Sequence, residues 1–191
     1  GPNARHRLVE RDDVELLRRL TKCNLERLKE HTLLQFAKCE IHISRTEELA
    51  AMTAEAKRGH FLVTGDPGCG KSGLIHALTE TLGKAGIPIV LLLAEEVYRR
   101  DWKGSENMLG LNHALDDVLA HWPDGAKGVL ITDALDAVRD VDTQRSLRRL
   151  LQDVQRGASG WTVVASVREF DLKYGRELRE AFPGDGVVGH S

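Results

Sequence analysis

The sequence has no long hydrophobic run, and this absence limits the kinds of protein that it can encode. Its longest unbroken apolar stretch, residues 87–94, contains Pro88 and is far shorter than the roughly 20 residues that a membrane-spanning helix needs. The chain does not open on the basic and then apolar segment of a signal peptide. We therefore expect a cytoplasmic protein with no membrane partner.

Cysteine and excess charge are also scarce. The three cysteines, Cys23, Cys39 and Cys69, have neither metal-ligand spacing nor the pattern of a disulfide framework, which favours a reducing compartment. A formal net charge of −2 gives no electrostatic reason to expect tight binding to nucleic acid. Any partner must therefore be inferred from particular sites.

The length of 191 residues suits one substantial domain with a small appendage. We expect residues 1–45 to form an N-terminal helical segment and linker, and residues 46–191 to form the core. The opening Gly1-Pro2 resembles the remnant of a cleaved tag, which we extend to residues 1–3. The final "GDGVVGHS" contains no closing element, so we expect a core truncated at its C-terminus and taken from a larger protein.

The pattern of apolar residues predicts helices followed by an alternation of strands and helices. A first helix is expected over residues 12–38, with Asp12 and Glu15 as a capping-box-like start, and a second over residues 46–57. The expected strands are 60–64, 87–94, 128–132 and 161–166, and the expected helices between them are 71–85, 107–120 and 143–156. This alternation is typical of an α/β domain built on a parallel sheet.

The strongest motif is "GDPGCGKS", which fills every fixed position of the P-loop pattern and lies where a strand is expected to turn into a helix. Glycines allow backbone N–H groups to point at phosphate oxygens, and the next helix presents its positive N-terminal end to the same anion. Lys71 would bridge the β and γ phosphates, and the Ser72 hydroxyl would hold Mg²⁺. The expected nucleotide-binding residues here are Gly65, Asp66, Pro67, Gly68, Cys69, Gly70, Lys71, Ser72 and Gly73.

Two further segments supply polar groups at expected strand ends. In "GVLITDALDA", Asp133 closes an apolar strand and is the expected second Mg²⁺ ligand, while Asp136 is placed to orient an attacking water. In "WTVVASVREF", Arg168 follows a strand that we expect between the P-loop strand and the Asp133 strand. Its guanidinium could stabilise charge on the γ-phosphate. We predict Asp133, Asp136 and Arg168 as the catalytic set.

Together these segments resemble the additional-strand, catalytic-glutamate class of P-loop ATPases, and within it the signal-transduction (STAND) ATPases with NACHT-type modules, which are related to the AAA+ proteins. The segment "IHISRTEELAAM" is similar to the stretch before the P-loop in that family. The resemblance implies a three-layer αβα P-loop NTPase with a central, mainly parallel sheet. It also implies that Ile43 and Arg45 flank the adenine base.

The same resemblance implies ATP or ADP with Mg²⁺ as cofactors. It further implies a slow ATPase that acts as a switch in signalling or immune defence, and that associates with itself or with other domains of the parent protein.

Two other functions remain open from the sequence. A small-molecule kinase can share the P-loop and the sheet, and "YRRDWKG" at residues 98–104, with Arg99, Arg100 and Lys103, is its candidate lid. A nucleotide-binding scaffold without significant turnover is the other alternative. A GTPase is less favoured, because the sequence has no Asn-Lys-x-Asp motif to read a guanine base.

Overall fold

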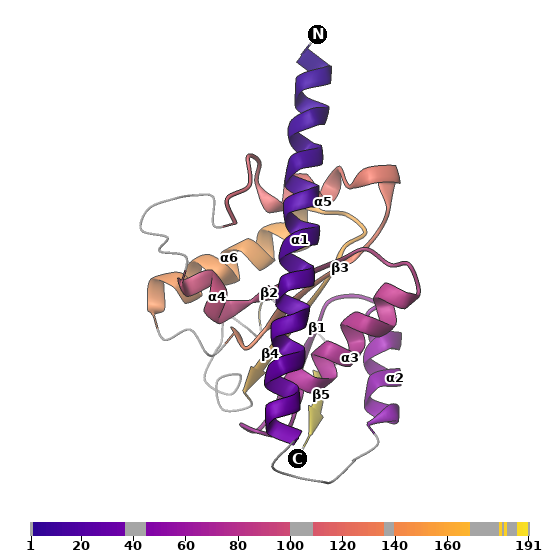
Figure 1. Cartoon of the computed structure of the whole chain (residues 1–191), viewed down its shortest axis with the longest axis vertical. Helices are drawn as coiled ribbons and strands as arrows, with labels where there is room; N and C mark the ends of the chain where they lie inside the picture. The colour runs from indigo at the N-terminus through magenta and orange to yellow at the C-terminus, as the bar shows by residue number, and fades with distance from the viewer. Residues whose placement is uncertain are drawn as a thin grey trace.

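The computed structural model describes residues 2–36, 45–99, 109–135, 140–168, 180, 182 and 187–190. The elements in chain order are α1 Pro2–Phe36, α2 Thr46–Glu55, β1 Phe61–Gly65, α3 Lys71–Lys84, β2 Ile89–Leu93, α4 Ala94–Arg99, α5 Leu115–Ala120, the short 3-10 helix η1 Pro123–Gly125, β3 Val129–Asp133, α6 Val141–Gly157, β4 Thr162–Arg168 and β5 Val187–His190. The alternation of strands and helices after residue 60 is as the sequence predicts (Figure 1).

The strands form one sheet of five in the order β2-β3-β4-β1-β5, and every pair is parallel. The strand that ends in Arg168 lies between the P-loop strand and the Asp133 strand, so that prediction is confirmed. A parallel sheet places the carboxyl ends of its strands at a single edge. The ends of β1, β3 and β4 are therefore neighbours.

Helices cover both faces of the sheet, which confirms the predicted α/β fold of three layers. Side chains alternate between the two faces along each strand, because the side-chain period of a strand is two. In β1, Phe61 and Val63 pack with α2 and α3, whereas Leu62 packs in the cluster that contains α5 and α6. Strands β1 and β3 are buried on both sides, as is typical of parallel sheets.

Helix α1 runs along the β2 edge of the sheet and contributes to both apolar layers. Leu17 is buried with the α5 and α6 layer, and Leu28 with the α2 and α3 layer. Two polar side chains of α1 also bind the backbone of β2. Thr21 Oγ1 accepts from the Leu91 N–H at 3.1 Å, and Asn24 Nδ2 donates to the Leu91 carbonyl at 2.9 Å. An edge strand offers unpaired backbone groups, and α1 satisfies them here.

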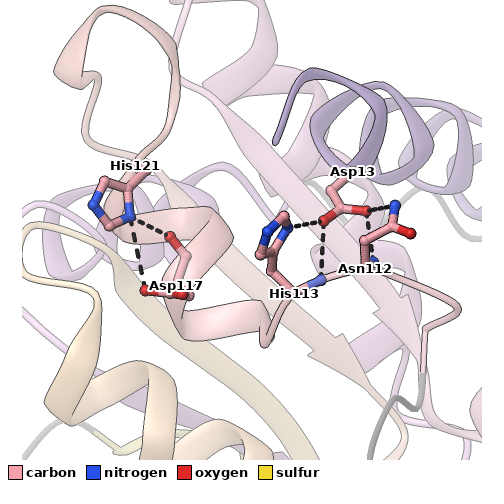
Figure 2. A network of polar contacts seen from close by, with 5 residues as sticks. All are labelled: Asp13, Asn112, His113, Asp117 and His121. Atoms are coloured by element: carbon pink, nitrogen blue, oxygen red, sulfur yellow. Dashed lines mark hydrogen bonds and ion pairs between the residues drawn. The ribbon is translucent and has the colours of Figure 1, made fainter. Parts of the chain in front are cut away.

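A buried carboxylate fixes α1 to the loop before α5 (Figure 2). Asp13 is 1% exposed, and Oδ1 accepts from the backbone N–H and Nδ2 of Asn112 at 2.8 and 2.9 Å. Its Oδ2 accepts from the His113 N–H at 3.1 Å and lies 2.8 Å from His113 Nδ1. Burial acts to raise the pKa of Asp13, but these hydrogen bonds outweigh it and hold the pKa below the ordinary 3.8.

This network also explains a wrong prediction. We expected a helix over residues 107–120, but α5 spans only Leu115–Ala120, and residues 109–114 form no helix. The backbone N–H groups of Asn112 and His113 are turned toward the Asp13 carboxylate instead. A long-range acceptor has therefore replaced the local helical bonds.

The structure corrects the two ends of the predicted pattern as well. Helix α1 begins at Pro2, so Asp12 is an interior helical residue and the predicted capping-box start is wrong. Proline suits a first helical position, because its missing N–H has no helical partner there. At the other end, β5 pairs with β1, so the closing residues do contain a core element.

Two further expectations about the chain can be compared with the fold. No helix among the described residues is both long enough and apolar enough to cross a membrane. The division into residues 1–45 and 46–191 stays a prediction, although α1 packs directly on the sheet edge of the second part.

We predict that replacing Asp13 destabilises the fold. Asp13→Ala should lower the free energy of unfolding by about 2–3 kcal/mol, because the donors of Asn112 and His113 lose their charged acceptor. Urea unfolding measures this change. Asp12→Ala is the matched control, since the neighbouring carboxylate is exposed.

The pH dependence has a defined sign. The folded pKa of Asp13 lies below 3.8, so the stability that it contributes is complete above the unfolded pKa and is lost as pH falls through the folded pKa. The stability of Asp13→Asn should fall less steeply over that acid range. If Asp12→Ala lowered the free energy of unfolding as much as Asp13→Ala, this account would be contradicted.

Candidate functional site

The P-loop connects β1 to α3 at the carboxyl edge of the sheet. Gly68 and Gly70 have φ values of 81° and 88°, a left-handed conformation that side chains rarely adopt. Helix α3 begins at Lys71, directly after the loop. The N–H groups of its first turn have no intrahelical partners, so this end carries partial positive charge. The predicted residues 65–73 thus form one continuous loop and helix start.

Lys71 crosses back over the loop. Its Nζ donates to the Gly65 carbonyl at 2.7 Å and to the Asp66 carbonyl at 2.9 Å. Both acceptors lie where β1 ends, so the ammonium group is held between the end of β1 and the start of α3. A full positive charge is therefore added to the partial charge of the helix N-terminus.

Asp133 lies at the centre of the site and is 4% exposed. Its Oδ2 accepts from Ser72 Oγ at 2.8 Å, and its Oδ1 accepts from Ser166 Oγ at 2.5 Å. The Ala134 N–H donates to the same Ser166 hydroxyl at 2.8 Å. Residues from α3, β3 and β4 are thus joined through one carboxylate, and the predicted pair of Ser72 and Asp133 is in direct contact.

The chain leaves β3 in an unusual conformation. Ala134, the residue after Asp133, has φ of 54°, in the left-handed region that a non-glycine residue rarely occupies. The hydrogen bond from its N–H to Ser166 helps to hold this turn. Strained backbone of this kind is found preferentially at functional sites.

Ser166 is the site residue that the sequence analysis did not assign. It is 1% exposed and is a polar residue within the buried strand "TVVASVR". A buried hydroxyl in an apolar strand requires a hydrogen-bonding partner, and this was the available signal. The sequence alone could not identify Asp133 as that partner.

Arg168 is the last residue of β4 and lies opposite Gly65 in the register of β1 and β4. It is two residues after Ser166 in the same strand, so it lies on the same face of the sheet, which is the face toward α3. Its side chain is exposed at the carboxyl edge. This position is compatible with the predicted phosphate contact, which stays a prediction.

Arg45 lies at the start of α2, as its N-cap residue, and its Nη2 donates to the Cys69 carbonyl of the P-loop. It is therefore next to the loop, although its predicted role beside the base is not tested. Asp136 and Ile43 lie outside the described residues, so their roles also stay predictions.

The sheet order and these contacts define the arrangement of the site. The P-loop motif follows β1, an acid closes β3, and β4 lies between these two strands. This fold is the predicted three-layer α/β fold, and the family that the sequence motifs suggest stays a prediction.

Comparisons with known proteins support the same fold. No family model and no curated protein matches the chain. The solved structure of AMPPCP-bound DnaA from Aquifex aeolicus is similar, with a TM-score of 0.54 and 14% identity over 78% of this chain and 47% of that chain. The Aeropyrum pernix ORC1 protein in complex with DNA is similar with a TM-score of 0.54 and 15% identity, over 79% of this chain and 46% of that chain. A DNA replication initiation factor is similar with a TM-score of 0.52 and 13% identity, over 75% of this chain and 44% of that chain.

This chain spans less than half the length of each of these three structures. At such low identity the likeness concerns the fold. The STAND or NACHT subtype that the sequence motifs suggested is not among these neighbours.

We predict that Ser166 contributes to stability through Asp133. Ser166→Ala should lower the free energy of unfolding by about 1–3 kcal/mol, because a buried carboxylate oxygen loses its hydroxyl donor. Denaturant unfolding measures the loss. Ser146→Ala on the exposed side of α6 is the control and should change little, and a loss no larger than in that control would contradict the role of Ser166.

Proposed function

We propose that this chain is an ATP-binding module that hydrolyses ATP slowly and acts as a switch within a larger protein. One observation supports this most directly: the P-loop, the N-terminus of α3, Lys71 and the contact between Ser72 and Asp133 all meet at the carboxyl edge of one sheet. In open α/β sheets, ligands bind outside this edge.

The loop fits a polyphosphate. Positive φ at Gly68 and Gly70 suits a backbone curled so that its N–H groups face an anion, and a Cβ at Gly68 would meet no heavy atom within 4 Å. Lys71 supplies the full charge near the β and γ phosphates. Both ends of the loop are fixed, so little further ordering is needed on binding.

The residues beside the loop also fit Mg²⁺. Ser72 and Asp133 offer hydroxyl and carboxylate oxygens, the hard ligands that this ion prefers. No cluster of three or more His, Cys, Asp or Glu suited to a metal occurs in the described part of the chain. This fits an ion that takes one or two protein ligands and completes its shell with phosphate oxygens and water. When bound, Mg²⁺ would neutralise charge on the β and γ phosphoryl oxygens.

The remaining roles are assigned by position. Ser166 orients the Asp133 carboxylate toward Ser72, and Arg168 would contact the γ-phosphate from the end of β4. Asp136 would orient the attacking water and accept its proton. Ile43 and Arg45 would border the base. An arginine supplied by another subunit or domain raises turnover greatly in related systems, so we expect the isolated chain to be slow.

Adenine is favoured over guanine because the sequence contains no Asn-Lys-x-Asp motif. The setting is proposed from the sequence motifs alone: their similarity to STAND ATPases suggests a signalling or defence protein that associates with itself. Among the structures of the same fold, one is instead a DNA replication initiation factor, and another is the Aeropyrum pernix ORC1 protein in complex with DNA. The proposed partners are adenine nucleotide and other parts of the parent protein.

Lys71→Ala should abolish nucleotide binding, because the loop loses the ammonium charge that we assign to the β and γ phosphates. Isothermal calorimetry with MgATP tests this. Lys84→Ala, at the exposed far end of the same helix, is the matched control and should bind normally. Unchanged affinity in Lys71→Ala would refute the assignment of the P-loop.

Asp133 and Asp136, the two carboxylates of "TDALD", should have different roles, the first in binding and the second in hydrolysis. Asp133→Asn should weaken Mg²⁺-dependent nucleotide binding, because the ion loses part of its support. Asp136→Asn should leave ATP affinity nearly intact and reduce hydrolysis by about 10²-fold or more, the scale of losing a positioned base.

Nucleotide affinity and single-turnover hydrolysis in both variants test this separation. Parental hydrolysis by Asp136→Asn would remove Asp136 from the catalytic set. Phosphate release by the parent chain distinguishes an ATPase from a binding scaffold, and phosphate transfer to an added metabolite would instead identify a kinase.

A further inference from the structure

Arg45 makes a contact with the P-loop that a residue bordering the base would not need. Its Nη2 donates to the Cys69 carbonyl, and its guanidinium lies beside Gly70. A Cβ built at Gly70 would come within 2.8 Å of Nη2 and 2.9 Å of Nη1. The glycine before Lys71 therefore provides both the left-handed turn and the space for Arg45.

The direction of this bond indicates where Arg45 acts. In a P-loop the N–H groups face the anion, so the carbonyl groups face away from it. Donation to the Cys69 carbonyl therefore holds the loop from its outer side. Lys71 binds the carbonyls of Gly65 and Asp66 at the beginning of the loop. Two cations thus hold the two ends of the same loop.

Among the described residues, no ion pair neutralises the charge of Arg45. Its Nη1 is buried and has no hydrogen-bond partner within the described residues. None of the ion pairs found in that part of the chain includes Arg45. Burying a cationic donor without a partner is costly, and an anion nearby reduces the cost. An anion bound at the loop would reduce this cost, because the guanidinium lies beside Gly70 of the same loop.

We propose that Arg45 is a positioning residue of the phosphate site, which holds the P-loop through Cys69 and adds positive charge to it. This inference rests on the proposed nucleotide binding. It gives Arg45 a role toward phosphate in place of the base-bordering role suggested by the sequence. Because Arg45 immediately precedes α2, it also ties the start of that helix to the loop.

The test compares ligands with and without a base. MgATP and magnesium tripolyphosphate are titrated by calorimetry into the parent chain, Arg45→Ala, Arg45→Gln and Arg45→Lys. Arg45→Ala and Arg45→Gln should each lower the affinity for both ligands by the same factor, about tenfold. Arg45→Lys should recover part of the lost affinity. Arg58→Ala is the control, because that arginine follows α2, is 75% exposed and pairs only with Glu55 among the described residues.

Each other outcome overturns the proposal. If the Arg45 variants bound ATP more weakly but tripolyphosphate normally, Arg45 would contact the base and not the phosphates. If they bound both ligands normally, Arg45 would have no role in binding. A parent chain that binds ATP but not tripolyphosphate would show that phosphate contacts do not supply the affinity. A parent chain that binds neither ligand would reject the proposed function itself. Should Arg45→Ala fail to fold, as seen in thermal unfolding, Arg45→Gln and Arg45→Lys still decide between these outcomes.

Discussion

The buried carboxylate of Asp133 is the constraint on which the site depends. A buried charge is tolerated only when it is hydrogen-bonded, and Asp133 has two hydroxyl donors, Ser72 from α3 and Ser166 from β4. Ser166 reaches Asp133 because β4 lies beside β3, and in the observed strand order β4 also separates β3 from β1. One carboxylate therefore joins the helix that follows the P-loop, β3 and the neighbouring strand β4.

The open edge of the sheet is the second constraint, and α1 satisfies it. β2 is an edge strand, and its outward backbone groups are bound by Thr21 and Asn24. Farther along the helix, Asp13 binds the loop before α5. The N-terminal helix thus closes the sheet edge and fixes a loop on the opposite face from α3. Although we predicted it as a separate segment, it contributes directly to the packing of the core.

The P-loop is held by side chains as well as by its glycines. Lys71 binds carbonyls where β1 ends, and Arg45 binds the Cys69 carbonyl close to the start of α3. An anion site made largely of backbone N–H groups needs such support, because unoccupied N–H groups do not themselves maintain a curled loop. The position of Arg45 also connects the P-loop to the start of α2.

The sequence by itself determined the local features: the P-loop, the strand that ends in Asp133, the alternation of strands and helices, and the parallel α/β class. Each depends on residues close together in the chain, where composition and period carry the information. Only the tertiary structure decided that Ser166 binds Asp133, that Asp13 binds a loop 99 residues away, and that β5 completes the sheet. The physical reason is that a buried polar group requires a partner, but its own sequence neighbourhood does not specify which distant group the fold brings to it.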